Sequence, residues 1–352
     1  MAQPQPKAQQ AGALPRPTLE SVAERAGVSR ATASRVVNGG TGVREALREK
    51  VRQAVDELGY APNLAARTLV TRRNQAIAVV VAEPESRLFS DPFFAQHLRG
   101  ISRELSAADN QMVLLLIEAQ QDYERVGRYL AGGHVDGALL FSLHRSDPLP
   151  EMARRVGLPT VIGGRPGWPG AESDRELVYV DSDNRGGARM AVQHLRSLGR
   201  TRIATITGPL DQTSSTDRLD GYRDLIPDGD PALIAEGDFT PDGGGRAMTE
   251  LLARRPDLDA VFAASDAMAS GALRVLRAHG RRVPEDVALV GFDDVESIAA
   301  WTEPPLTTIR QDIEEMGRLM ARLLLRRLAS PAQPLAPTSV ITPTQLVRRE
   351  SA

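Results

Sequence analysis

Two arginines near the beginning of the chain have the chemistry needed to recognise DNA bases. Arg30 and Arg35 fall on the polar side of a predicted helix that starts after Ser29. Each guanidinium group can donate two parallel hydrogen bonds to the O6 and N7 atoms of guanine. Their neighbours are mostly small or hydroxyl-bearing, and the candidate DNA contacts in this segment are Thr18, Ser29, Arg30, Ala31, Thr32, Arg35 and Asn38.

The residues around these arginines predict two helices that would hold them in place. Apolar residues recur at every third or fourth position, at Leu19, Val22, Ala23 and Ala26. This period places them on one face of a helix. Thr18 can cap the start of that helix with its hydroxyl, and Gly27 can end it with a left-handed backbone conformation. A second helix behind Ser29 then predicts a helix-turn-helix, with its second helix placed for the major groove. The alternative is a pair of surface helices with solvated arginines.

A third helix is predicted over residues 44–58 and would complete a small three-helix core. Its apolar side consists of Leu47, Val51, Ala54, Val55 and Leu58. Arg44 stands where a Ser, Thr, Asp or Asn would cap the helix, and a missing cap costs about 1 kcal/mol. We therefore expect an uncapped start that frays readily.

The segment that follows this core predicts a conformational switch. Pro62 presets the geometry of a first helical turn, but residues 63–71 offer barely two turns. A helix this short is unstable alone in water, so it would form only when packed against a partner segment and DNA. The alternative is a plain linker with incidental hydrophobic residues.

Several motifs in a fixed order resemble the lactose-repressor family of bacterial transcription regulators. They are SVAERAGVSRATASRVVNG, YAPNLAARTLVTRR, SDAMASGAL, VALVGFDDVESI and EPPLTTIRQDIEEMG, and the resemblance spans residues 17–351. Within the family, four shorter stretches are most similar to the cellobiose-responsive repressors, namely LVTRR at 69–73, SLHRSDPLP at 142–150, GGRP at 163–166 and EGDFT at 236–240.

The resemblance implies an α/β fold, in which an N-terminal helix-turn-helix head of three helices precedes a two-lobed core of parallel sheets like that of periplasmic binding proteins. Strand-like and helical segments alternate after residue 74, which independently predicts parallel sheets covered by helices. The expected domains are a disordered tail at 1–16, the head at 17–62, a hinge helix and linker at 63–74, and an effector-binding and dimerisation domain at 75–352. The expected lobes are about 75–181 with 312–335, and about 182–311 with 336–352.

The resemblance also assigns roles to the hinge. Leu69 and its copy in a second subunit would wedge between the central base pairs from the minor groove, and a wedge of this kind kinks the duplex. Ala66 would lie against the groove floor, and Arg67 would reach a phosphate or the groove. The implied hinge contacts are Asn63, Ala66, Arg67 and Leu69, and the implied assembly is a homodimer on a double-stranded, pseudo-palindromic operator.

Side chains at the ends of predicted strands indicate a sugar site, because ligands of open α/β sheets bind beyond the carboxyl ends of the strands. The planar fork of Arg218 can bind adjacent hydroxyls, Asp293 can accept hydrogen bonds from hydroxyls, and Phe239 offers an apolar face for a pyranose ring. By resemblance, the residues that line the effector cleft are Phe94, Arg165, Arg218, Phe239, Ser265, Asp293 and Gln311.

Some of these positions have other interpretations. Phe94 and Phe239 are also compatible with the hydrophobic core, and Arg165 with a solvated surface charge. Two roles stay open for Trp168 and Trp301, contact with the ligand and contact at the subunit interface.

Composition and charge favour a DNA-binding regulator over an enzyme. Residues 16–73 hold 11 basic and 6 acidic residues, whereas the whole chain of 352 residues carries a net charge of −2. The phosphate-binding surface is therefore expected on the head. No motif for nucleotide binding or hydrolysis is legible, there is no cysteine, and no histidines are spaced for a metal site. We expect no cofactor and no metal.

The resulting hypothesis is a repressor of sugar-utilisation genes that a small sugar, cellobiose or a related β-glucoside, releases from its operator. No signal peptide or membrane-spanning run is recognisable, so a cytoplasmic, nucleoid-associated protein without a membrane partner is expected. The alternative is a corepressor-type or global regulator of the same family, whose DNA binding a ligand or partner protein enhances.

Overall fold

The computed structural model describes residues 17–60, 73–171, 177–227, 229–330 and 339–352. The chain divides into two units, with the boundary between Asn74 and Gln75. The tail at 1–16 and the hinge residues Asn63, Ala66, Arg67 and Leu69 lie outside the described residues.

The first unit contains the three helices that the sequence predicts, α1 (Leu19–Ala26), α2 (Arg30–Val37) and α3 (Glu45–Leu58). The backbone N–H of Ser21 donates to Thr18 Oγ1 (3.2 Å), and that of Thr32 donates to Ser29 Oγ (3.1 Å). Arg44 supplies no capping bond to α3, which confirms the predicted uncapped start. The helices enclose a small core of Val22, Ala23, Ala26, Ala33, Val36, Val51 and Ala54.

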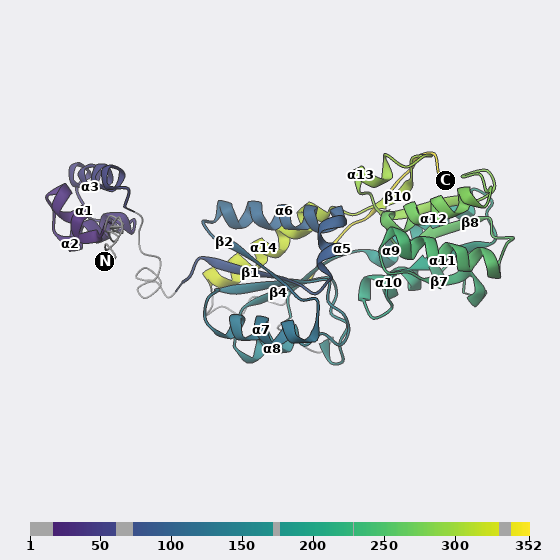
Figure 1. Ribbon diagram of the computed structural model, residues 1–352, viewed down its shortest axis with the longest axis horizontal. Helices are drawn as coiled ribbons and strands as arrows, with labels where there is room; N and C mark the ends of the chain where they lie inside the picture. The colour runs from purple at the N-terminus through teal and green to yellow at the C-terminus, as the bar shows by residue number, and fades with distance from the viewer. Residues whose placement is uncertain (1–16, 61–72, 172–176, 228, 331–338) are drawn as a thin grey trace, which may run out of the picture. The chain divides into compact units, whose positions relative to one another are not determined.

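The first lobe of the second unit is built on a parallel sheet (Figure 1). Its strand order is β11-β5-β4-β3-β1-β2, and the strands are β1 (Ala76–Val81), β2 (Gln111–Leu116), β3 (Gly137–Phe141), β4 (Thr160–Gly163), β5 (Tyr179–Ser182) and β11 (Val340–Thr342). Alternate residues of β1 face opposite cores, because strand side chains alternate. One face packs on α6 (Pro92–Ala107) and α14 (Ile313–Ala329), and the other on α7 (Gln120–Ala131) and α8 (Leu149–Arg155).

The second lobe repeats this arrangement with the order β12-β10-β9-β8-β6-β7. Its strands are β6 (Ile203–Thr207), β7 (Ile234–Glu236), β8 (Ala260–Ala263), β9 (Ala288–Asp293), β10 (Thr307–Arg310) and β12 (Gln345–Val347). Helices α9 (Asn184–Ser197) and α10 (Thr213–Arg223) cover one face, and α11 (Pro241–Arg254) and α12 (Asp266–Ala278) cover the other. The shorter elements of the unit are α5 (Glu85–Ser90), η2 (Pro231–Leu233) and α13 (Glu296–Ala299).

The chain crosses between the lobes three times. The last crossing lies at a different position from the one that was expected. Residues 336–352 were expected in the second lobe, but β11 pairs with β5 in the first sheet. The crossing therefore falls between Thr342 and Gln345. Strand β12 then pairs antiparallel with β10, so the second sheet is not wholly parallel. Among the described residues, no helix combines the length and apolar character needed to cross a membrane.

Candidate functional site

The head presents its candidate DNA contacts on and beside α2. Arg30, Ala31 and Arg35 are exposed on this helix, and Asn38 is exposed at its end. Ser29 and Thr32 also serve the cap of α2, while Thr18 stands at the start of α1. Arg30 Nε lies 2.5 Å from Glu20 Oε1 in an exposed ion pair. A guanine contact by Arg30 would therefore exchange this pair for a base.

The second unit contains a cavity of about 100 Å³ between its two lobes. Side chains from the carboxyl ends of strands in both sheets line it, as expected for open α/β sheets. Four of the predicted effector residues are among them, namely Arg218, Phe239, Ser265 and Asp293.

Arg218 is buried among polar groups on the second-lobe side of this pocket. Its Nε donates to Asn184 Oδ1 (2.8 Å), and its Nη1 donates to the carbonyl oxygen of Ala264 (2.5 Å). The guanidinium carbon lies 3.6 Å from the ring centroid of Phe292. Burial lowers the pKa of Arg218, and Asp293, whose Oδ1 lies 3.7 Å from Nη1, opposes this shift.

Asp293 ends β9 with a positive φ of 113°, a backbone strain that is typical of functional sites. Burial raises the pKa of Asp293 to about 7, against the opposing effect of Arg218. Gln311 Nε2 donates to Asp293 Oδ1 (2.6 Å). Asp181 shares this environment, and burial raises its pKa to about 6. The pocket therefore combines a desolvated cation with carboxyl groups whose pKa values are raised by burial.

Three predicted effector residues do not line this cavity. Phe94 is fully buried in the first-lobe core, and its neighbour Phe93 lines the pocket instead. Arg165 forms a two-bond ion pair with Asp217 (3.0 and 2.6 Å) beside a smaller cavity. Gln311 stands behind Asp293, which it orients. Each departure has a tertiary cause, because packing partners from distant segments decide which way a side chain points.

Phe239 does line the pocket, but its ring already contacts two neighbours. Gly208 lies against the ring, since a Cβ atom there would come within 2.1 Å of the ring carbons. The guanidinium carbon of Arg87, from the first lobe, lies 5.0 Å from the ring centroid. A pyranose that stacks on the ring face beneath Arg87 would therefore have to displace Arg87.

Several lining residues were missed by the sequence analysis. Asp181 and Ser182 end β5, a strand of four residues that was not predicted, and Asn184 follows it. Ser142 directly follows β3 and also lines the pocket. Ser142 could have been predicted from the sequence, because it directly follows a predicted strand and ligands bind beyond the carboxyl ends of strands. Arg87, Phe93 and His97 lie on helices and carry no such local signal.

Direct contacts join the lobes beside the pocket. Gln212 Nε2 donates to Glu83 Oε1 (3.0 Å), and His144 Nδ1 lies 2.8 Å from Asp211 Oδ2. The backbone N–H of Arg145 donates to the carbonyl oxygen of Asp211 (2.8 Å). The lobes therefore contact each other directly beside the pocket. Within the described parts of the chain, no three His, Cys, Asp or Glu residues gather as metal ligands.

The chain matches two known domain families over its two units. Residues 18–63 match the family described as bacterial regulatory proteins, lacI family, and residues 192–352 match the periplasmic binding protein-like domain. The HTH-type transcriptional regulator CelR of Thermobifida fusca is 52% identical over 341 residues, which cover 96% of this chain and 98% of that protein. The ribose operon repressor of Escherichia coli K12 is 37% identical over 324 residues, which cover 89% of this chain and 94% of the repressor.

Solved structures give the same result. A complex of the transcriptional regulator CelR with cellobiose superposes with a TM-score of 0.75 at 50% identity, covering 96% of this chain and all of that one. The lac repressor dimer bound to its operator and an anti-inducer has a TM-score of 0.80 at 28% identity, covering 95% and 98%. These relatives confirm the predicted fold and the resemblance to the cellobiose-responsive repressors, and they are regulators, not enzymes. The chain belongs to the lacI family of bacterial regulatory proteins and is a DNA-binding transcriptional regulator.

Proposed function

We propose that this regulator represses sugar-utilisation genes and is released from its operator by cellobiose or a related β-glucoside. The observation that carries the proposal is the cross-lobe pocket, where the buried guanidinium of Arg218 meets Asp293 at 3.7 Å. The 52% identity to CelR and the structural similarity to a complex of CelR with cellobiose support the choice of sugar.

The pocket offers the hydrogen-bonding groups that sugar hydroxyls require. A hydroxyl both donates and accepts, so it can receive a bond from Arg218 and give one to Asp293. Ser265 Oγ accepts from the backbone N–H of Met268 (3.2 Å) and keeps its own proton for a ligand. The assignment of Arg218, Phe239, Ser265 and Asp293 as effector contacts rests on this complementarity and on their common place in the pocket.

Release of DNA requires the sugar to prefer one arrangement of the lobes. A ligand with equal affinity for both states shifts nothing. In the proposed mechanism, sugar bound between the lobes favours an arrangement in which the paired hinge segments separate. The bonds between Gln212 and Glu83 and between His144 and Asp211 stabilise the arrangement of the lobes in this structure, and sugar would alter that stability.

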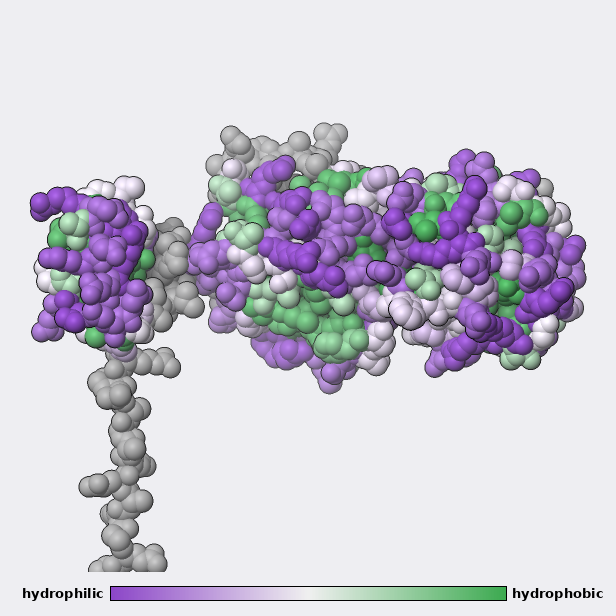
Figure 2. All heavy atoms as spheres, turned by 90° about the horizontal axis from the view of Figure 1, so that it is seen from above, coloured by the Kyte–Doolittle hydropathy of each residue, from purple (hydrophilic) through white to green (hydrophobic). Residues whose placement is uncertain are grey.

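A homodimer is supported by hydrophobic surface on the second unit. Trp301 is 82% exposed and Phe89 is 71% exposed. Strand β2 lies at a sheet edge, and its Met112, Leu114 and Leu116 are only partly buried. Figure 2 shows hydrophobic side chains gathered on one face of the first lobe. Exposed apolar patches and free sheet edges of this kind are typical of protein interfaces, so Trp301 is assigned to a subunit contact and not to sugar stacking.

The operator complex would place α2 of each head in the major groove, where Arg30 and Arg35 face guanines. Asn63, Ala66, Arg67 and Leu69 would act in the minor groove between the two half-sites. Phosphate contacts by the basic head predict binding that weakens with salt. The regulator would work in the cytoplasm, on the nucleoid.

The test is a fluorescence-anisotropy titration of the protein against a palindromic operator from upstream of its own gene, with and without cellobiose. Tight binding that cellobiose weakens by about 10-fold or more is expected, within the usual range of allosteric coupling. Tight binding that is indifferent to cellobiose would refute this effector. Binding that appears only with cellobiose would identify a corepressor-type regulator.

A further inference from the structure

Two buried nitrogen atoms on the first-lobe side of the pocket have no hydrogen-bond partner in the described part of the chain. They are Arg87 Nε and His97 Nδ1, and both residues line the cross-lobe pocket. Buried polar atoms in native proteins are almost always paired, because an unpaired one bears its full desolvation penalty. Because both residues line the same pocket, one ligand bound there can supply a partner for both atoms.

The guanidinium group of Arg87 is held in a fixed position. Its Nη1 lies 2.5 Å from the buried carboxylate of Glu83. Its central carbon lies 5.4 Å from the ring centroid of Phe94 and 5.0 Å from that of Phe239, so aromatic rings from both lobes flank it. These contacts engage the charge and the faces of the group, while its Nε–H remains as a free donor.

His97 is held just as firmly on α6. Its ring stacks on Phe141 with centroids 4.7 Å apart and planes 14° from parallel, and its Nε2 lies 3.1 Å from the sulfur of Met320. Burial lowers the pKa of His97 to about 4, so the imidazole is neutral near pH 7. Because a thioether sulfur can only accept, the Nε2–H donates to it and Nδ1 is left as an acceptor.

We propose that Arg87 and His97 bind the effector directly, with Arg87 Nε–H donating to one sugar hydroxyl and His97 Nδ1 accepting from another. The first lobe thereby supplies a donor and an acceptor, opposite Arg218 and Asp293 of the second lobe. This assignment rests on the proposed function of the pocket as a sugar site. It adds to that function the two residues that select hydroxyls on the first-lobe side.

The test uses the full-length protein, isothermal titration with cellobiose, and thermal unfolding without sugar. His97→Phe keeps the stacked ring, and Arg87→Lys keeps a cation beside Glu83. Each should weaken cellobiose binding by about 10-fold, the effect of losing one or two hydrogen bonds. The sugar-free melting temperature of His97→Phe should stay unchanged or rise, because an unpaired buried nitrogen has been removed. His279→Phe, which lies outside the pocket, should leave cellobiose binding unchanged.

Other outcomes separate the two hypotheses. Unchanged cellobiose binding by both variants would refute the direct contacts. A fall in the sugar-free melting temperature of His97→Phe would assign His97 a structural role. If the unmodified protein does not bind cellobiose, the proposed effector is wrong, and a fall in the sugar-free melting temperature of His97→Phe would also refute an unpaired state of its nitrogen.

Discussion

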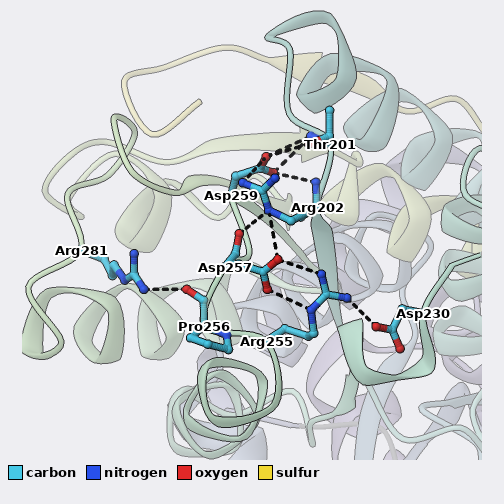
Figure 3. Close-up of polar contacts among 8 residues, drawn as sticks. All are labelled: Thr201, Arg202, Asp230, Arg255, Pro256, Asp257, Asp259 and Arg281. Atoms are coloured by element: carbon cyan, nitrogen blue, oxygen red, sulfur yellow. Dashed lines mark hydrogen bonds and ion pairs between the residues drawn. The ribbon is translucent and has the colours of Figure 1, made fainter.

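Two clusters of arginine and aspartate lie at opposite ends of the second-lobe sheet. At the carboxyl ends, Arg218 and Asp293 are buried in the pocket. At the amino ends, Figure 3 shows a cluster of Thr201, Arg202, Asp230, Arg255, Pro256, Asp257, Asp259 and Arg281. The residue types are similar, but the two clusters serve different purposes.

The polar groups of the amino-end cluster form hydrogen bonds and ion pairs with one another. Arg255 donates two bonds to Asp257 (2.9 and 3.0 Å), and Asp259 accepts from the backbone N–H of Arg202 (2.9 Å). These groups are partly exposed, and the bond from Arg255 lowers the pKa of Asp257. In the pocket, burial raises the pKa of Asp293 instead. Charges that are paired and solvated stabilise loops, whereas desolvated groups with spare hydrogen-bonding capacity are available to a ligand.

The largest effect that tests this contrast is expected for Arg218→Met. Cellobiose affinity should fall by about 100-fold, because hydrogen bonds to a charged group are lost and Asp293 loses its nearby cation. Operator affinity without sugar should change little, and calorimetry with operator anisotropy measures the two properties separately. If cellobiose affinity stayed normal, Arg218 would have no place in the effector site.

The pH dependence of stability should have opposite signs in the two clusters. Asp293 has a folded-state pKa of about 7 against an ordinary value of 3.8, so the folded state binds more protons between these values. Its contribution to stability is therefore lost as pH rises towards 7. Asp293→Asn stays neutral, and its melting temperature should rise relative to the unmodified protein between pH 5 and pH 8.

Asp257 provides the matched comparison for that series. Its pKa is lowered in the folded state, so its contribution is present above about pH 4 and is lost in acid. Asp257→Asn should therefore be less stable than the unmodified protein near pH 7 and approach it at low pH. Parallel pH profiles for Asp257→Asn and Asp293→Asn would contradict the proposed difference in burial.

The smallest effect is expected for Arg255→Met in the amino-end cluster. Exposed ion pairs contribute little and are screened by salt, so the melting temperature should fall by about 2 °C or less and the difference should shrink at high salt. Cellobiose affinity should be unchanged in calorimetry. A loss of sugar binding comparable to that of Arg218→Met would show that the amino-end cluster is coupled to the effector site.

Signals in the sequence were sufficient to predict the helices of the head and some of the residues that line the pocket. The capping hydroxyls of Thr18 and Ser29 and the uncapped start at Arg44 could be read directly, because a cap bonds within its own helical turn. Arg218 was found by resemblance together with its chemistry. Asp293 could be placed as well, since it ends a strongly hydrophobic strand whose carboxyl end must face the cleft.

The rest depended on contacts between distant segments. Whether Phe93 or Phe94 lines the pocket is decided by the packing of α6 on the first sheet, and the role of Gln311 by its bond to Asp293. The short strands β5 and β11 form by pairing with each other, so neither has a pattern of its own. Periodicity and caps are properties of neighbouring residues, and the sequence by itself determined those features. A buried atom without a partner, such as Arg87 Nε or His97 Nδ1, arises only when the lobes are folded around a pocket, and only the tertiary structure decided it.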